Sequence, residues 1–306
     1  MVYLHAMSPL IDKICHFLKE KGFCCSRLAR NGLDCISVSI QRNQSDRLIL
    51  PLNISAEDPQ EAETQAKHIH ESIKQLMRED GDYPLIVTED RWNIQNEMMK
   101  ARILSHLDVF NPIYARNCEA RKIDKATAKE FLEKNHTYGH AACRYCYGLF
   151  FKRHTGHIAQ DAEKGSSLTS WQPDKGELMA VATFSNARKW AKGDKTIRSY
   201  EWTRYASLPQ VRLSGGMGRL LKAFINDVQP DDIMSYADLE WSEGAVYSQL
   251  GFELEGRKDP VTFEIDACWQ RIPIKKNADK DTHCEKTKYF QNLGSNKYRL
   301  KLTDYE

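Results

Sequence analysis

Three glycines within four residues precede an amphipathic pattern in the stretch LSGGMGRLLKAFI, residues 213–225. Glycine loses more backbone entropy on folding than any other residue, so such a cluster needs a local reason. The apolar residues that follow recur at helical spacing and predict a helix within 213–228. Two explanations fit the glycines. Backbone N–H groups at the helix N-terminus face a phosphate, or the chain makes a tight turn from a strand into the helix.

The sequence around the glycines excludes one class of phosphate-binding loop and disfavours another. The pattern predicts a strand over 198–208 before them, a strand over 231–239 after the helix, and a short helix within 242–252. No Lys-Ser or Lys-Thr pair follows Gly218, which excludes a P-loop. A dinucleotide-binding βαβ unit is disfavoured, because the glycines come late in the chain and follow an apparent antiparallel meander.

The first 110 residues have the pattern of a small α/β domain. Apolar spacing predicts helices over 8–21, 55–80 and 93–107, and strands over 34–41, 47–54 and 84–90. We therefore expect a first domain that ends near residue 110.

Residues 111–274 have the pattern of a second domain that is richer in strands. Strands are expected over 113–123, 145–151, 177–185 and 261–272, with a helix over 124–136 that Asp124 caps. Residues 152–176 are polar and predict a loop. The rest of the chain, 275–306, is expected to be a charged loop followed by an amphipathic basic segment.

The composition limits the class of protein. The 306 residues are 41% hydrophobic and 28% charged, which is typical of a globular chain. The formal net charge of +2 means that any nucleic-acid site must be a local patch. No apolar run approaches the ~20 residues that span a bilayer, and the start lacks the order of a signal peptide. Nine scattered cysteines favour free thiols, so we expect a cytoplasmic protein without a membrane partner.

Two motifs carry a resemblance to a known family. One is the glycine stretch, and the other is GAVYSQLGF, residues 244–252. With these motifs, residues 113–272 resemble the Gcn5-related N-acetyltransferase (GNAT) superfamily. That family has an Arg/Gln-x-x-Gly-x-Gly/Ala loop before the helix that holds the coenzyme A pyrophosphate, and a signature similar to Ala-x-x-Leu-Tyr-x-x-Leu-Gly-Phe. Gly216 and Gly218 match the loop, whereas Leu213 stands at the Arg/Gln position and Arg212 lies one place early.

The resemblance implies acetyl-CoA or another acyl-CoA as cofactor and an amine of unknown identity as acceptor. It implies that Tyr247 is the general acid near the thioester sulfur and that Glu201 or Asp238 is the base. His136 is a third candidate, because imidazole titrates near neutrality, and its alternative role is to end the preceding helix. The residues implied for cofactor binding are Arg212, Ser214, Gly215, Gly216, Met217, Gly218 and Arg219 for the pyrophosphate, Arg204, Tyr205, Ala206 and Ser207 for the pantetheine arm, and Ser242, which alternatively caps a helix.

A narrower resemblance covers residues 84–265. The motifs FLEKNHTYG, LMAVATFSNAR, SYEWTRYASL and SYADLEWSEGAVYSQLGFE are similar to a GNAT-like region of phage and mobile-element proteins, often joined to homing-endonuclease modules. This implies a setting near DNA, with DNA-base modification or nucleic-acid binding without catalysis as alternatives to acyl transfer. It also implies that residues 1–110 are related to restriction endonucleases. No Glu-x-Lys follows Asp34, so we expect this domain to be non-catalytic.

The stretch NHTYGHAACRYCYG offers a metal alternative. His136, His140, Cys143 and Cys146 have a spacing that can bind zinc, and His154 and His157 follow. Tyrosines that alternate with the cysteines favour a strand, in which Cys143 and Cys146 would point to opposite faces. We therefore expect no metal.

Two basic stretches are the candidates for nucleic-acid contact. The first is expected to be a loop around Trp190, and its cations are Arg188, Lys189, Lys192, Lys195 and Arg198. The second is the weaker group Lys297, Tyr298, Arg299 and Lys301. A solvated surface is the alternative for both.

The sequence thus predicts an α+β chain. A small α/β domain precedes a GNAT-like domain with a mixed, mostly antiparallel sheet flanked by helices. The leading hypothesis is an acyl-CoA-dependent N-acyltransferase, and the alternative is a nucleic-acid-binding or DNA-base-modifying module on the same scaffold.

Overall fold

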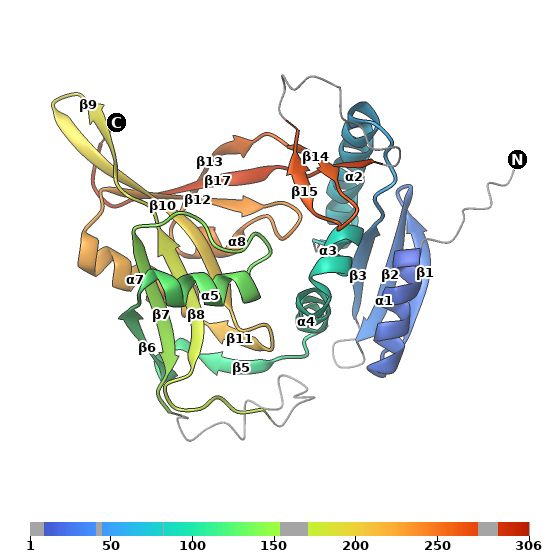
Figure 1. Ribbon diagram of the computed structural model, residues 1–306, viewed down its shortest axis with the longest axis horizontal. Helices are drawn as coiled ribbons and strands as arrows, with labels where there is room; N and C mark the ends of the chain where they lie inside the picture. Colours follow the sequence, from blue (N-terminus) through green and yellow to red (C-terminus); the bar gives the residue numbers. More distant parts are fainter. Residues whose placement is uncertain (1–8, 41–44, 82, 154–170, 275–286, 306) are drawn as a thin grey trace, which may run out of the picture. The chain divides into compact units, whose positions relative to one another are not determined.

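A computed structural model of the chain describes residues 9–40, 45–81, 83–153, 171–274 and 287–305 (Figure 1). The chain forms two compact units. Unit 1 consists of Met1–Leu107, Asp238–Glu243 and Arg257–Ser295, and unit 2 of Asp108–Ala237, Gly244–Gly256 and Asn296–Glu306. Neither unit is contiguous in sequence, in contrast to the contiguous segments that we expected.

Unit 1 contains a four-stranded sheet in the order β1-β2-β3-β4. β1 (Cys25–Arg30), β2 (Leu33–Ile40) and β3 (Ser45–Leu52) form an antiparallel meander, and β4 (Leu85–Thr88) is parallel to β3. A parallel step needs a crossover connection, which α2 (Pro59–Asp80) supplies. The other helices are α1 (Pro9–Glu20), α3 (Glu89–Ile94) and α4 (Asn96–His106). These elements confirm the helices and strands expected before residue 110, and β1 is an addition.

Alternating side chains of β2 bury both faces of this sheet. Ile36 and Val38 belong to a cluster with residues of α1 and α4, such as Ile103. Cys35 belongs to a second cluster with Ile73 of α2. The period of two in the strand therefore places helices on both faces of the sheet.

Unit 1 also contains a three-stranded antiparallel sheet in the order β15-β14-β16. Its strands are β14 (Thr262–Ile265), β15 (Arg271–Pro273) and β16 (Lys288–Gln291). The prediction of one strand over 261–272 is therefore wrong. The Asp266 carboxylate accepts hydrogen bonds from the backbone N–H groups of Cys268 and Gln270, at 2.9 and 2.8 Å. This side chain folds the backbone into a turn between two strand-like apolar stretches.

Unit 2 is built on an eight-stranded sheet. Its order is β13-β17-β12-β10-β8-β7-β6, and β9 pairs with β10. The strands are β6 (Cys118–Lys122), β7 (Tyr145–Phe151), β8 (Leu178–Phe184), β9 (Arg188–Lys192), β10 (Lys195–Ser207), β12 (Asp232–Asp238), β13 (Glu253–Lys258) and β17 (Ser295–Lys301). The pairs β6–β7, β7–β8, β8–β10 and β9–β10 are antiparallel, whereas β10 and β12 are parallel. The predicted mixed sheet is confirmed.

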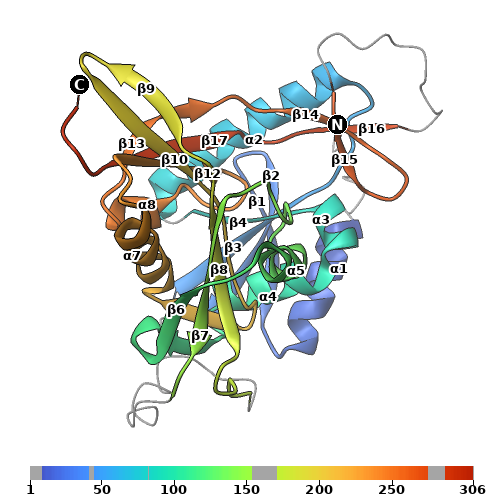
Figure 2. The same ribbon diagram turned by 60° about the vertical axis from the view of Figure 1, so that its left-hand side comes forward.

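Helices cover both faces of this sheet (Figure 2). On one face α7 (Gly216–Val228) places Phe224 on Phe184, with ring centroids 3.9 Å apart. On the other face α5 (Lys125–Asn135) packs Leu132 into a separate cluster with Val181. Asp124 caps α5 as predicted, because its carboxylate accepts the Thr127 N–H at 2.8 Å. The sheet is thus flanked by helices.

The structure differs from two further predictions about local structure. The strand expected over 113–123 is interrupted, because β5 (Asn111–Tyr114) ends in a short 3-10 helix, η1 (Ala115–Asn117), before β6 begins. β5 pairs with β11 (Val211–Ser214) in a separate two-stranded parallel sheet. The expected basic tail forms β16 and β17. Among the helices of the described ranges, none has the length and apolar character required to cross a membrane.

Candidate functional site

The candidate site of unit 2 begins where two parallel strands stop pairing. β10 and β12 pair over three residues only, the last pair being Glu201 and Met234. β10 then shifts its register against β8 between Trp202 and Arg204, which marks a bulge. From there to Ser207 its other edge pairs with no strand among the described residues. The Thr203 and Arg204 carbonyls already accept side-chain hydrogen bonds, and the other backbone groups of this edge can pair with an extended ligand.

The glycines of LSGGMG are required by the turn that leads from β11 into α7. Gly215 has a φ of 77°, in the left-handed region that side chains other than glycine rarely adopt. A Cβ at Gly216 would lie 2.9 Å from the Tyr205 hydroxyl and 2.8 Å from Leu213. The left-handed backbone therefore explains Gly215 and tight packing explains Gly216 without any ligand, as the second of the two sequence explanations predicts.

The turn also leaves a free helix N-terminus. The first backbone bond of α7 runs from Arg219 N–H to the Gly215 carbonyl, at 3.0 Å. The N–H groups of 216–218 have no acceptor in the described part of the chain, and the first turn carries no acidic residue. A Cβ at Gly218 would meet only Leu250, at 3.1 Å. These N–H groups and the positive end of the helix dipole can bind an anion.

Leu213 stands at the Arg/Gln position of the GNAT loop and Arg212 precedes it, and both side chains have structural contacts. Leu213 packs against the core of unit 2. Arg212 is exposed, with Nη1 lying 3.7 Å from Asp108 and its guanidinium over the ring of Phe110. Of the basic residues predicted for the pyrophosphate, Arg219 is the one in the first turn of α7. Ser214 and Met217 flank the turn, the former exposed and the latter partly buried.

Tyr247 lies beside the end of the β10–β12 pairing. Its hydroxyl is 2.8 Å from the Ser235 hydroxyl on β12, and Ser235 donates to the Trp202 carbonyl of β10 at 3.0 Å. Its ring stacks on Tyr298 with centroids 5.1 Å apart. Burial raises the pKa of Tyr247, and the Ser235 hydrogen bond partly opposes this. Tyr247, in the middle of the short helix α8 (Ala245–Gln249), therefore presents a protonated hydroxyl where β10 and β12 stop pairing.

The sequence analysis missed Ser235. It belongs to the buried stripe Ile233, Ser235 and Ala237 on β12, where it is 1% exposed. A polar residue within an apolar stripe of period two was the available signal, because a buried hydroxyl needs hydrogen-bond partners.

Glu201 lies on β10 immediately before the bulge. Its carboxylate is half-buried and has no hydrogen bond or ion pair within the described ranges. Arg204 donates to the Gly139 carbonyl at 3.2 Å and lies over the ring of Tyr138. Burial lowers the pKa of Arg204, and the nearby Glu201 carboxylate partly opposes this. Electrostatic interaction therefore links Glu201 to the segment that follows α5.

His136 ends α5. Its N–H bonds to the Leu132 carbonyl at 2.9 Å, and its Nδ1 accepts the Tyr138 N–H at 3.1 Å. These bonds agree with the alternative role of ending the helix. Of the other residues predicted for the pantetheine arm, Tyr205 packs against the core with its hydroxyl near Gly216, Ala206 is buried in the α5 cluster, and Ser207 ends β10.

Asp238 and Ser242 belong to unit 1. Asp238 Oδ2 lies 3.4 Å from Arg91 Nη2, and Asp238 Oδ1 accepts the Glu240 N–H at 2.9 Å. These structural contacts explain the Asp238 carboxylate without a catalytic role. Ser242 does not cap α8, because Gly244 is the N-cap with a φ of 91° and no side-chain bond. The prediction of a Ser242 cap is wrong, since the chain enters α8 through a left-handed glycine.

Asp238 is part of a cluster of paired charges, the unit 1 ion cluster. Its members are Asp90, Arg91, Asp238, Glu240 and Arg271. Arg271 lies 2.5 Å from Asp90 and 3.0 Å from Glu240, both fully buried. Although burial favours the uncharged acid, Arg271 holds the pKa of Asp90 below its ordinary value. The two arginines of the cluster pair with its three carboxylates, and Arg102 adds a third positive charge that interacts electrostatically with Asp238 and Glu240.

The Cys-His stretch brings two sulfurs together but not four ligands. Cys143 Sγ lies 3.4 Å from Cys146 Sγ. The prediction that they point to opposite faces is wrong, because β7 begins at Tyr145 and Cys143 precedes it. Within the described ranges, no group of three or more His, Cys, Asp or Glu side chains is placed to hold a metal. His154 and His157 lie outside these ranges.

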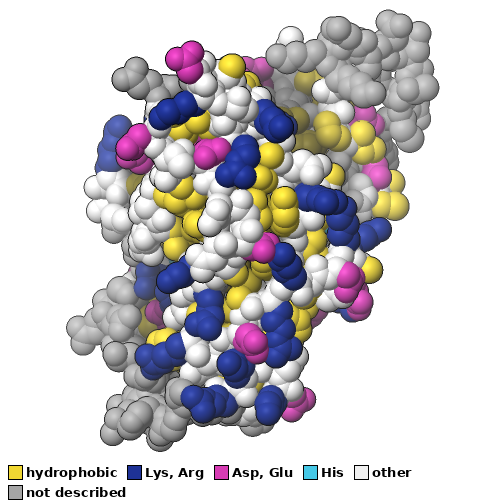
Figure 3. Space-filling model, turned by 90° about the vertical axis from the view of Figure 1, so that its left-hand side faces the viewer, with side chains coloured by type: hydrophobic (Ala, Val, Ile, Leu, Met, Phe, Trp, Pro, Cys, Tyr) yellow, Lys and Arg dark blue, Asp and Glu magenta, His cyan; other side chains and the backbone are white. Residues whose placement is uncertain are grey.

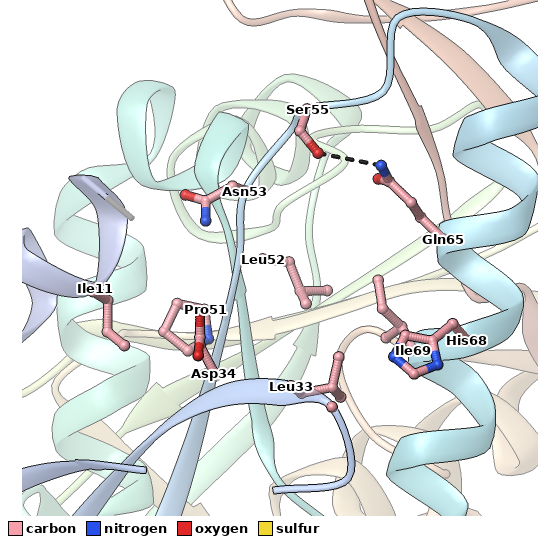
Figure 4. Close-up of a pocket in the computed structure, with 11 residues that line it drawn as sticks. Ile11, Leu33, Asp34, Pro51, Leu52, Asn53, Ser55, Gln65, His68 and Ile69 are labelled. Atoms are coloured by element: carbon pink, nitrogen blue, oxygen red, sulfur yellow. Dashed lines mark hydrogen bonds between the residues drawn. The ribbon is translucent and has the colours of Figure 1, made fainter. Parts of the chain in front are cut away.

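A cavity of about 240 Å³ lies in unit 1 (Figure 4). Asp34 is the one acidic side chain among the described residues that line it. Figure 4 shows Leu33 and Leu52 between Asp34 and the polar side chains of Gln65 and His68. The cavity therefore lacks the converging carboxylates that a two-metal nuclease requires.

The two basic stretches differ in structure. Residues 188–198 form the hairpin of β9 and β10 rather than the loop that we expected. In the second stretch, Glu255 pairs with Lys297 at 2.7 Å and with Arg299 at 2.8 Å, and Tyr298 is buried. Acidic neighbours thus neutralise two of the cations of the second stretch.

No protein-family model and no curated protein matches the chain. Among solved structures, the chain is similar to Eis1 from Mycobacterium abscessus, with 14% sequence identity and a TM-score of 0.32. The match covers 48% of this chain and 33% of that chain.

Proposed function

We propose that unit 2 is an acyl-CoA-dependent N-acyltransferase of the GNAT type. The observation that carries the proposal is the end of β10–β12 pairing after three residues, with Tyr247 beside it and the free N-terminus of α7 on the connection between the two strands. Ligands of α/β sheets bind at the carboxyl ends of parallel strands and at helix N-termini. This arrangement is also what the sequence resemblance implies.

Three parts of unit 2 suit the three parts of an acyl-CoA. The N–H groups of 216–218, with Arg219 beside them, suit the pyrophosphate. The unpaired edge of β10 over Arg204–Ser207 suits the amides of the pantetheine arm, because it offers the bonds of a missing strand. When bound, the acyl-CoA supplies a thioester-activated acyl group.

Two side chains would move protons. The Tyr247 hydroxyl would protonate the leaving sulfur, and burial keeps this hydroxyl protonated at neutral pH. Glu201 would accept a proton from the amine, since its carboxylate has no hydrogen bond or ion pair within the residues that the structure describes. Asp238 and His136 are less suited to this role, because each already has structural partners.

Calorimetric titration of acetyl-CoA into the full chain tests the proposal. Gly218→Glu places a carboxylate among the free N–H groups, and we expect it to raise Kd from the micromolar range by at least about tenfold, a loss of about 1.4 kcal/mol. Gly256→Glu is the matched control, since a Cβ at Gly256 meets nothing within 4 Å. Absence of binding at millimolar acetyl-CoA, or equal losses in both variants, would contradict the proposal.

A further inference from the structure

The hairpin of β9 and β10 is an exposed basic ribbon in unit 2. The two strands pair from Ser199–Arg188 to Lys195–Lys192, and β9 pairs with no other described strand. Both views show β9 and the start of β10 projecting beyond the other strands of the sheet (Figures 1 and 2). A two-stranded ribbon of this kind can enter a groove or lie along a strand of nucleic acid.

The cations of the ribbon remain available. Arg188 and Lys189 are exposed and have no ion pair with any described residue. Lys195 donates to a backbone carbonyl, that of Asp304, and forms no ion pair with any residue that the structure describes. Arg198 is the exception, because it pairs with Asp231 at 3.3 Å. The ribbon therefore differs from β17, where Glu255 pairs with Lys297 and Arg299, and Arg299 pairs also with Asp232 at 2.7 Å.

An aromatic ring lies among these cations. Trp190 is 53% exposed and stands opposite Ile197, so it shares a face with Arg188, two residues before it. Lys and Arg side chains are widespread on the face of the molecule in Figure 3. An exposed indole next to unpaired cations is the combination that stacks on an unpaired base while the cations bind phosphates.

We propose that the β9–β10 ribbon binds single-stranded nucleic acid. Arg188 and Lys195, which share the face of Trp190, bind the phosphates, and Trp190 stacks on a base. The single strand is favoured over a duplex because a base must be unstacked to receive the indole. The proposal is independent of acyl-CoA binding, which uses α7 and the other end of β10.

Fluorescence anisotropy of a labelled oligothymidylate with the full chain tests this, at potassium chloride concentrations from about 50 to 200 mM. We expect Arg188→Gln/Lys195→Gln to reduce the slope of log K against log salt by about 1.4, at about 0.7 for each phosphate that the protein no longer neutralises. Trp190→Ala should raise Kd about fivefold to a hundredfold, with little change in slope.

Two control variants keep the test specific. Lys125→Gln/Lys129→Gln removes the same charge from α5, and Trp241→Ala removes another exposed tryptophan, 41% exposed. Both should bind as the wild type does. No binding by the wild type, equal effects of control and ribbon variants, or tighter binding of a duplex that Trp190→Ala leaves unchanged would each overturn the proposal.

Discussion

The unit 1 ion cluster and the candidate site of unit 2 hold ionisable groups in opposite ways. In unit 1, Asp90 and Glu240 are fully buried and bonded to Arg271. In unit 2, Glu201 has no hydrogen bond or ion pair among the described residues, and Tyr247 bonds only to a neutral hydroxyl through its Oη. Buried charges must be paired to be tolerated, whereas a group that moves a proton must be open to a new partner. Pairing therefore separates structural carboxylates from candidate catalytic ones.

The largest expected effect comes from breaking the cluster. Arg271→Met removes the paired cation of buried Asp90 and leaves buried Glu240 with Arg91 alone, so we expect the free energy of unfolding to fall by about 3–5 kcal/mol. Urea denaturation followed by circular dichroism measures this. Lys288→Met, an exposed lysine on the neighbouring β16, should change it by about 0.5 kcal/mol or less. A loss from Arg271→Met no larger than the control's would show that the cluster is not structural.

A smaller effect should distinguish the two carboxylates that the sequence proposes as bases. Glu201→Gln should lower the rate of coenzyme A release from acetyl-CoA, in the presence of a panel of primary amines, by about a hundredfold. Asp238→Asn should leave that rate within about twofold, because its role is to pair with Arg91. Acetyl-CoA affinity should be unchanged in both variants. The reverse order of rates would make Asp238 the base and remove the distinction drawn from pairing.

The smallest effect concerns an exposed pair, Glu255 with Arg299. The Arg299 hydrogen bond, with Lys297, lowers the pKa of Glu255 from 4.5 to about 2. A carboxyl whose pKa is lower in the folded state stabilises above its unfolded pKa, and that stability is lost as pH falls from about 4.5 to 2. Because the Glu255 side chain is 37% exposed, we expect this pair to contribute at most about 1 kcal/mol to the free energy of unfolding.

Urea denaturation of Glu255→Gln and wild type at about pH 5 and pH 3 measures that contribution. The difference between them should shrink at the lower pH. Glu253→Gln, which removes another exposed carboxyl of β13, is the matched control. A difference that grows on acidification would have the wrong sign for a lowered pKa.

The sequence predicted the elements whose pattern is local. The period of two in β2 and the helical spacing in α1 and α7 identified these elements, because burial on one or both faces dictates the spacing. Asp124 was correctly predicted as a cap, since its partner Thr127 lies three residues away. The residues of the glycine turn could also be identified from sequence alone.

Predictions failed where a side chain or a distant segment decides the structure. The Asp266 turn divides a stretch whose apolar pattern reads as one strand. The left-handed Gly244 displaced Ser242 as the cap of α8. The partner of Asp238 lies 147 residues earlier, at Arg91, and no local pattern reveals such a contact. The sequence thus located the candidate residues but not the partners that separate structural from reactive groups.

Unit 1 consists of segments that lie far apart in the sequence, which has a consequence for its synthesis on the ribosome. Asp90 emerges 181 residues before Arg271, the cation that neutralises it. Until then, the growing chain has the β1–β4 sheet but lacks both the guanidinium and the β14–β16 strands that complete unit 1. All of Asp108–Ala237, most of unit 2, is translated in this interval. Unit 1, whose synthesis begins first, is therefore completed only after most of unit 2 has been synthesised. Until Arg271 is added, water must solvate the Asp90 carboxylate.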